Sequence, residues 1–421
     1  MKTIALNILA SILLVALLVS CKKSSDVNPS EQPYKQKIFL NEKAQAIVEA
    51  DNTFGINLFK KLNDLSEEEG ANMIISPLSV SIALGMTYNG SEGETKEAME
   101  NALGFSGLSV EEINQSYQTL INALTTVDPK VTMEIPNSIW YRDTFSVLQD
   151  FIDLNQNYFY AKVLPLDFND PASVGIVNNW VAEGTHNKII EIIDGIDETA
   201  VIFLINAVYF NGTWKFEFDE QNTQLQPFYL SNGTTKQVDM MQQEATLNYT
   251  ANNLFEAVDL YYGSGNFSMV IILPRETYST EDIIAEMNAV KWSAWINSFS
   301  EANIHLSLPK FKLEYEERLN DALIELGMGI AFDPFTADFS KINPDYQLYI
   351  GFVKHKTFID VNEEGTEAAA VTIVGIELTS AGDDQPYYFY VNRPFLFAIK
   401  ERDTKAILFL GKVMEPDYDD K

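Results

Sequence analysis

A stretch of twenty-five residues, 362–386, separates two segments that have the composition of β-strands, residues 352–361 and 387–399. Connections of this length are uncommon inside compact domains, and those that occur are usually functional or disordered. From Ala368 to Leu378 the stretch is largely small or apolar, rich in β-branched residues and free of proline. It is therefore competent to form a strand, although an exposed unpaired strand normally promotes aggregation. We expect later insertion of this segment into a sheet to be the function of the chain.

Residues 1–20 have the pattern of an export signal, with Lys2 ahead of an apolar run over residues 4–19. That run is short for a membrane-spanning helix. The sequence Leu18-Val19-Ser20-Cys21 resembles a bacterial lipobox, which implies cleavage before Cys21 and attachment of lipid to its sulfur. The alternative is an ordinary signal peptide. Cys21 is the only cysteine, so an intramolecular disulfide cannot form.

Residues 21–45 are predicted to form a tether, because residues 22–37 are polar and contain two prolines. Residues 46–416 show no linker-like break in composition and no internal repeat, so we predict one domain there despite its length. Residues 417–421 form a short acidic tail. The net charge of −31 disfavours nucleic acid and anionic membrane surfaces as partners.

The predicted helices come early in the chain and the long strands come later, which favours an α+β fold. Ser76-Pro77 predicts a helix start, since serine is a good N-cap and proline suits the first helical position. Apolar spacing predicts helices over residues 46–62, 77–89, 95–103 and 110–124. Strands are predicted over residues 72–75, 201–210, 267–273, 304–312, 352–361, 387–399 and 406–413. The run 201–210 is apolar almost throughout, as in a strand buried on both faces, whereas 304–312 alternates like a half-buried strand.

Six short motifs occur along residues 46–416 in the order found in one large family. They are Asn72-x-x-x-Ser76-Pro77-x-Ser79, Asn206-Ala-Val-Tyr-Phe-x-Gly212-x-Trp214, Leu308-Pro309-Lys310-Phe311, the run Glu363–Ala370, Asn392-Arg393-Pro394-Phe395 and Phe409-x-Gly411-Lys412-Val413. On these motifs the chain resembles the serpin superfamily. The resemblance implies three β-sheets, eight or nine helices and an exposed reactive centre loop.

The resemblance further implies that the chain inhibits endopeptidases as a suicide substrate. The implied targets are serine endopeptidases and, in addition, cysteine endopeptidases. The target protease supplies the nucleophile, and the cleaved loop traps the acyl-enzyme by entering the main sheet. The chain is then expected to be no enzyme and to need no cofactor or metal. Its three histidines, His186, His305 and His355, lie far apart without metal-ligand spacing.

The hinge at the start of the loop suits insertion. Alternation along a strand places Thr366, Ala368, Ala370 and Thr372 on one face, and all four are small. The remaining hinge residues are Glu363, Gly365 and Ala369. Non-inhibitory members of the family often carry a bulky, charged or proline residue in this region, so the hinge favours an inhibitor. The alternative is a non-inhibitory serpin that acts as a binding or carrier protein.

In the family the scissile residue lies about sixteen residues beyond the hinge glutamate, which implies Thr379–Ser380 here. Leu378–Thr379 is the alternative bond. There is no Lys or Arg from Thr357 to Asn392, which disfavours trypsin-like targets because their pocket requires a cation. Elastase-, subtilisin- and chymotrypsin-like proteases fit better, papain-like enzymes are further candidates, and Glu377 leaves a glutamate-specific protease as an outside option.

Two groups of residues match family positions that control the main sheet. The shutter group, which governs opening of the sheet, is Ser76, Ser79, Asn206 and His355. The breach group, where the loop first enters, is Trp214, Lys310 and Glu363, and we predict an ion pair between Lys310 and Glu363. His355 is either a switch or an ordinary core histidine.

The remaining expectations concern partners and location. Residues 110–124 contain no Lys or Arg, so we expect no heparin site, and we expect a monomer. Export and a lipid on Cys21 would place the protein at the outer membrane, with its face undetermined. A nutrient-binding lipoprotein is a further alternative, although it explains none of the internal motifs.

Overall fold

The computed structural model describes residues 35–66, 70–366 and 386–418, and these ranges belong to one compact unit. The export signal, Cys21, hinge residues Ala368–Thr372 and both candidate scissile bonds lie outside the described residues. In the described part of the chain, no helix has the length and apolar character needed to cross a membrane.

Nine α-helices occur in the described ranges, and the helices predicted from sequence are among them. They are α2 (Glu42–Leu65), α3 (Pro77–Tyr88), α4 (Gly93–Leu103), α5 (Val110–Thr126), α6 (Gln149–Phe159), α7 (Ala172–Gly184), α8 (Thr280–Glu286), α9 (Ala289–Ile296) and α10 (Asn320–Leu323). The predicted cap at Ser76 is present, with its hydroxyl accepting from Ser79 N at 3.3 Å. A π-turn, η2 (Ile324–Met328), and two 3₁₀ turns, η1 (Glu220–Asn222) and η3 (Gly329–Phe332), complete the helical elements.

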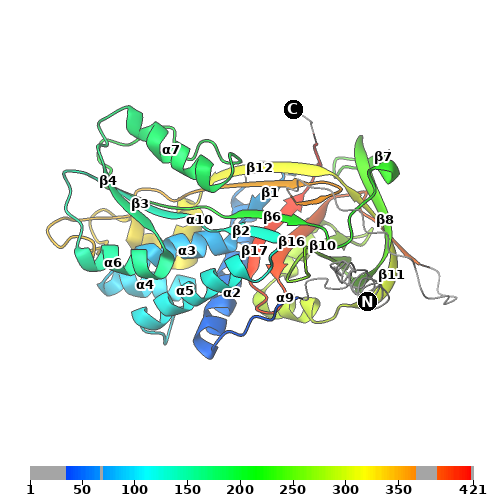
Figure 1. The fold of residues 1–421 in the computed structure, drawn as a ribbon, viewed down its shortest axis with the longest axis horizontal. Helices are drawn as coiled ribbons and strands as arrows, with labels where there is room; N and C mark the ends of the chain where they lie inside the picture. The colour runs from blue at the N-terminus through cyan, green and yellow to red at the C-terminus, as the bar shows by residue number, and fades with distance from the viewer. Residues whose placement is uncertain (1–34, 67–69, 367–385, 419–421) are drawn as a thin grey trace, which may run out of the picture. The chain divides into compact units, whose positions relative to one another are not determined.

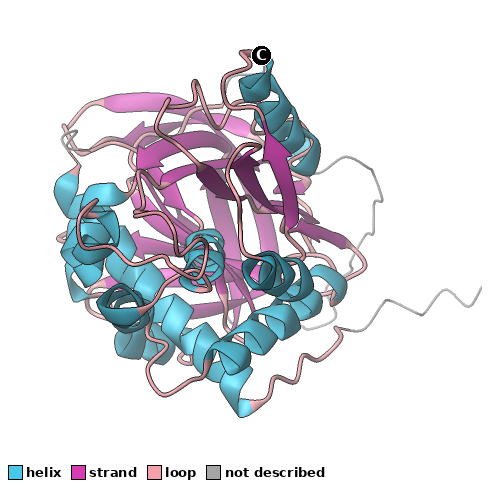
Figure 2. Cartoon of the chain, turned by 90° about the vertical axis from the view of Figure 1, so that its left-hand side faces the viewer, coloured by secondary structure: helices cyan, strands magenta, loops and turns pink. Residues whose placement is uncertain are grey.

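The strands of the described residues form three sheets, as predicted. Figure 2 shows the strands, in magenta, gathered at the centre of the molecule. The nine-stranded sheet has the order β1 (Met73–Ile75), β17 (Ile407–Val413), β16 (Phe395–Glu401), β10 (Phe267–Pro274), β9 (Phe255–Tyr261), β8 (Thr235–Ala251), β11 (Ser300–Pro309) and β15 (Tyr387–Tyr390), with β7 (Gln224–Tyr229) paired to β8. The five-stranded sheet has the order β12 (Phe311–Arg318), β13 (Lys354–Val361), β14 (Gly365–Thr366), β6 (Tyr209–Thr213) and β2 (Val131–Glu134). The three-stranded sheet has the order β4 (Lys162–Leu166), β3 (Asn137–Arg142) and β5 (Ile202–Asn206).

Helices pack on both faces of the three-stranded sheet. Helix α3 contacts β5 from one side, while α7 lies on the other side of the strands (Figure 1). Val177 and Val181 of α7 pack with Trp140, Phe203 and Ile205 in a separate small core. The main core joins α2 and α3 to the nine-stranded sheet.

Three strand predictions were wrong in their extent. Residues 201–210 are two strands in different sheets, and β5 is fully buried only at Phe203 and Ile205, which face the small core with α7. Residues 304–312 break at Lys310, whose N–H donates to Asp239 O across the corner at 2.9 Å. Residues 387–399 break after Tyr390, where Pro394 interrupts the pairing. The strands predicted over 267–273 and 406–413 are confirmed and fully buried.

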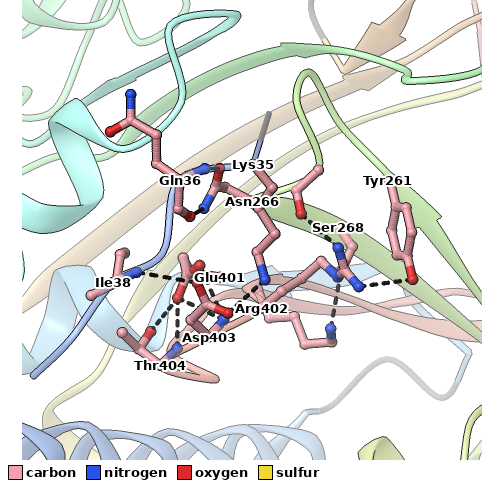
Figure 3. A network of polar contacts seen from close by, with 12 residues as sticks. Lys35, Gln36, Ile38, Tyr261, Asn266, Ser268, Glu401, Arg402, Asp403 and Thr404 are labelled. Carbon is pink, nitrogen blue, oxygen red and sulfur yellow. Dashed lines mark hydrogen bonds and ion pairs between the residues drawn. The ribbon is translucent and has the colours of Figure 1, made fainter. Parts of the chain in front are cut away.

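The tether predicted over residues 21–45 was wrong from Lys35 onward, because α2 begins at Glu42 and residues 35–40 are docked. We call residues 35–40 the N-terminal strap (Figure 3). Lys35 Nζ lies 2.5 Å from Asp403 Oδ1, and Ile38 N donates to Asp403 Oδ2 at 3.2 Å. Asn266 exchanges two hydrogen bonds with the backbone of Gln36. These long-range contacts override the polar composition that predicted a free tether.

Candidate functional site

The hinge already forms a two-residue strand inside a sheet. Strand β14 lies between β13 and β6, with Thr366 opposite Val361 on one side and Gly212 on the other. The Thr366 side chain is 2% exposed, and its Oγ1 is hydrogen-bonded to the Tyr262 hydroxyl at 2.5 Å. The structure therefore places the first inward residue of the predicted hinge between two strands.

Gly365 makes the closest backbone approach in this region. A Cβ built on Gly365 would lie 2.2 Å from Gly212 O and 2.7 Å from Thr213 Cα. Both of those atoms belong to the backbone of β6, so neither can move aside cheaply. Glycine is required here because β14 pairs so tightly with β6.

The residues just before β14 form a turn held by Asn362. Asn362 Oδ1 accepts from Glu364 N at 3.1 Å and from Gly365 N at 3.2 Å, in the manner of an Asx turn. Trp214 secures the same turn from β6, since its backbone N donates to Glu364 O and its Nε1 donates to Asn362 O. The chain is thus ordered up to Thr366 by contacts on both sides.

The predicted ion pair of the breach group is confirmed. Lys310 Nζ lies 3.1 Å from Glu363 Oε2, and their side chains are 17% and 8% exposed. The other carboxylate oxygen of Glu363 accepts from Thr223 Oγ1 at 2.7 Å, so both oxygens have partners. Trp214, the third member of the group, stacks on Tyr262 with ring centroids 4.4 Å apart. Glu363 is thereby fixed two residues before β14.

The shutter group also comes together, under the junction of the two small sheets. His355 Nε2 accepts from Ser76 N at 3.0 Å, and Ser79 Oγ donates to Asn206 O at 3.5 Å. Since Ser76 and Ser79 both begin α3, the helix start contacts β13 on one side and β5 on the other. The two strands are not paired with each other.

His355 is buried and neutral in this arrangement. Burial lowers the pKa of His355 to about 4, and its Nε2 carries no proton because it accepts from Ser76 N. A charged imidazole would lose this hydrogen bond. Sequence reasoning left a core role and a switch role open, and the geometry shows a packed histidine whose protonation would disrupt the start of α3.

Asn206 has one buried atom without a partner. Its Nδ2 donates to Asn137 Oδ1 on the neighbouring strand β3 at 2.5 Å. Its Oδ1 is buried and accepts no hydrogen bond within the described ranges. A buried unpaired acceptor is costly, so the Asn206 side chain is not fully hydrogen-bonded in this conformation.

Sequence reasoning missed three residues that hold the hinge: Tyr262, Thr223 and Asn362. Asn362 directly precedes the first hinge residue, Glu363, and its ability to form an Asx turn was a usable signal. Tyr262 and Thr223 carried no local signal, because the fold alone brings them beside β14. Among the residues singled out from sequence, the structure unites Trp214, Lys310 and Glu363 with Gly365 and Thr366.

A family model described as Serpin (serine protease inhibitor) matches residues 49–416. This chain belongs to the serpin family. It is 36% identical over 388 residues to intracellular coagulation inhibitor 2 of Tachypleus tridentatus, which covers 90% of this chain and 94% of that protein. It is also 34% identical over 381 residues to an uncharacterized serpin-like protein of Methanosarcina acetivorans, covering 89% of this chain and 87% of the relative.

Solved structures of serpins superpose on this serpin over most of their length. The native state of the thermophilic serpin tengpin gives a TM-score of 0.79 at 34% identity and covers 90% of this chain and 96% of that one. Human thyroxine-binding globulin gives a TM-score of 0.81 at 26% identity, covering 89% of this chain and all of that one. The α+β serpin fold with three sheets is thus established for this serpin.

Proposed function

We propose that this serpin inhibits serine endopeptidases as a suicide substrate, with cysteine endopeptidases as secondary targets. The single observation that carries the proposal is the buried hinge residue Thr366, paired on both sides within the five-stranded sheet. Insertion of the reactive loop into a sheet is a known property of serpins. What the chain contributes is a hinge that has begun to enter the sheet and has no bulky residue to stop it.

The register of β14 supports continued entry. In antiparallel pairing each step forward along the loop is one step back along β13, so Ala368 would lie opposite Ile359 and Thr372 opposite His355. Ile359 and His355 of β13 are buried, so Ala368 and Thr372 would face the packed interior there, where small side chains are the easiest to add. The shutter group lies at the level of Thr372. An inserted threonine there would bring a hydroxyl near the unpartnered Asn206 Oδ1.

The chemistry of trapping belongs to the target protease. Its nucleophile attacks the carbonyl of the scissile bond, the peptide bond breaks, and the C-terminal fragment leaves as an amine while the N-terminal part of the loop stays on the protease as an ester, or as a thioester on a cysteine protease. This break frees the segment that follows Thr366. Insertion of about thirteen residues at ~3.3 Å each would carry the attached protease by ~40–45 Å. Displacement of the ester from the oxyanion hole slows deacylation, since loss of one donor there costs about 10²–10³ in rate. Insertion must be faster than deacylation, which is why an ordered hinge entrance matters.

The proposed reactive bond is Thr379–Ser380, with Leu378–Thr379 as the alternative. Elastase-, subtilisin- and chymotrypsin-like proteases are the proposed targets, and papain-like enzymes follow. The absence of Lys and Arg from the loop argues against trypsin-like targets. Intracellular coagulation inhibitor 2 is by its name an inhibitor, which is consistent with this class of activity.

The test is a reaction of the full chain with subtilisin, elastase and trypsin in parallel. We expect an SDS-stable covalent complex with the first two and none with trypsin. Mass spectrometry of the released C-terminal peptide identifies the scissile bond. Cleavage of the loop with full retention of protease activity would instead indicate a non-inhibitory binding or carrier protein.

We also propose that the protein is exported and held at the outer membrane by lipid on Cys21. The Leu18-Val19-Ser20-Cys21 pattern supports this proposal. Metabolic labelling with a radioactive fatty acid should mark the wild type, and Cys21→Ser should abolish the label and release the protein from the membrane fraction. Label retained in Cys21→Ser would contradict the anchor.

A further inference from the structure

Asp417 and Tyr418, the first two residues of the acidic tail, lie beside the breach group. Pro416, which follows β17, is buried, and Lys312 N donates to the backbone oxygen of Asp417 at 2.8 Å. This bond attaches the tail to the start of β12, two residues beyond Lys310. This bond places Tyr418 next to the ion pair between Lys310 and the hinge residue Glu363.

The Tyr418 ring lies against the cation of the breach ion pair. Lys310 Nζ is 4.2 Å from the centroid of this ring, and Lys312 Nζ is 5.1 Å from it. An ammonium over an aromatic face is attracted by the ring quadrupole. Lys310 therefore has Tyr418 as a second partner besides Glu363 and is held at the hinge by both.

The Tyr418 hydroxyl makes a second contact near the hinge, with the side chain of Asn362. It accepts a hydrogen bond from Asn362 Nδ2 at 3.5 Å. The opposite end of the same amide, Asn362 Oδ1, accepts from Glu364 N and Gly365 N. A side-chain amide held at its nitrogen end presents its oxygen in a defined direction. The tyrosine thus orients the group that caps the turn before β14.

We propose that Tyr418 is a positioning residue for the hinge. Its ring holds Lys310 against Glu363, and its hydroxyl orients Asn362 so that the turn over residues 362–365 is preformed in the uncleaved protein. The proposal deepens the proposed function and rests on it for its consequence during inhibition. The positioning itself is a property of the uncleaved protein and is testable without a protease.

The test compares Tyr418→Phe and Tyr418→Leu with the wild type in the full chain. Hydrogen exchange of the Glu364 and Gly365 amides is measured with single-residue resolution. Loss of the hydroxyl alone should accelerate both amides by about 3- to 10-fold, as expected for one hydrogen bond. Loss of the ring should accelerate them further, because Lys310 is then less restrained. Thermal melts of both variants establish that they are folded.

Asp417→Asn is the matched control. It removes the exposed ion pair between Asp417 and Lys236 while leaving the backbone oxygen that anchors the tail. Exchange at Glu364 and Gly365 should then match the wild type. Unchanged exchange in both Tyr418 variants would overturn the proposal, as would equal acceleration in Asp417→Asn.

The consequence for inhibition is measured on the same variants with subtilisin. A disordered turn delays insertion but not deacylation, so Tyr418→Leu should need more inhibitor per protease molecule than the wild type. If the wild type forms no covalent complex, the proposed function fails, while the exchange result still decides the positioning role. If the wild type inhibits and the exchange rates do not change, the positioning role alone is wrong.

Discussion

Thr366 Oγ1 lies 2.5 Å from the hydroxyl of Tyr262, so the first inward side chain of the hinge is already packed within the five-stranded sheet. Tyr262 is itself buried and stacked on Trp214, which pairs with the turn before β14. The starting state of the proposed inhibitor is therefore one in which strand addition has begun.

Replacing Thr366 with arginine should convert the protein from an inhibitor into a substrate. An unpaired charge at this buried position is costly, so the hinge would be expelled or would insert slowly after cleavage. The measurement is the ratio of covalent complex to cleaved serpin after reaction with subtilisin. Thr366→Ser retains the hydroxyl and should behave as the wild type. Equal complex formation by Thr366→Arg would show that this position does not limit insertion.

Reversal of the charge at Glu363 should destabilise the uncleaved protein. Loss of Glu363 leaves the largely buried Lys310 without its anionic partner, and breaking such a pair costs about 3–5 kcal/mol when both groups are fully buried. We expect about 2–3 kcal/mol for Glu363→Lys because Lys310 keeps some solvent contact. Denaturant unfolding gives the free energy, and light scattering follows polymerisation, which should rise.

The double variant Lys310→Glu/Glu363→Lys is the matched control for that change. It restores opposite charges at the same two positions and should recover part of the lost stability. If Glu363→Lys alone left both stability and polymerisation at wild-type levels, the ion pair would have no structural role.

Two buried groups should give opposite dependences of stability on pH. The pKa of His355 is lowered to about 4 by burial, so between pH 6.5 and 4 the unfolded chain takes up a proton that the folded chain does not. The contribution of His355 to the free energy of unfolding is fully present above pH 6.5, and it falls by about 3 kcal/mol as the pH drops to 4. Denaturant unfolding of His355→Gln across this range should show a flatter acid limb.

Asp51 on α2 should act in the reverse sense. Burial raises its pKa to about 7, while the Tyr117 hydroxyl donates to its Oδ1 at 2.8 Å. The folded state therefore keeps a proton on Asp51 that the unfolded state releases above pH 4. The contribution of Asp51 to the free energy of unfolding is lost as the pH rises toward 7. Asp51→Asn should gain stability relative to the wild type over this rise. A constant difference between the two proteins from pH 4 to 7 would contradict the assignment.

The N-terminal strap should contribute measurable stability. Asp403→Ala removes the partner of Lys35 and of Ile38 N, and one partly buried charged hydrogen bond contributes about 1.5–3 kcal/mol. Limited proteolysis near Lys35 should also become faster. Lys291→Ala, which breaks an exposed ion pair on α9, should have little effect and serves as the control. Wild-type protease resistance in Asp403→Ala would argue that the strap is held by other contacts.

The sequence predicted the elements with strong local signals and the residues within family motifs. Ser76 marked the start of α3 because helix capping depends on local sequence. The ion pair between Lys310 and Glu363 was predictable because both residues lie in family motifs. The break after Asn206 was not predictable from composition, since each half of residues 201–210 is equally apolar and only the partner strands differ. The contact of Tyr262 with the hinge was not predictable for a similar reason. It depends on the β9–β10 turn lying beside the end of β6, which only the fold determines.

The close approach of Gly365 to β6 determines the alignment of any strand that grows from the hinge. Only glycine fits against the Gly212 carbonyl, so a slip by one residue would place Glu364 or Thr366 where no Cβ is tolerated. A one-residue slip would also turn the small face outward and the Glu367 face inward. In the proposed insertion, Gly365 would therefore set the register, and the face that the segment turns inward would be decided before most of that segment had entered.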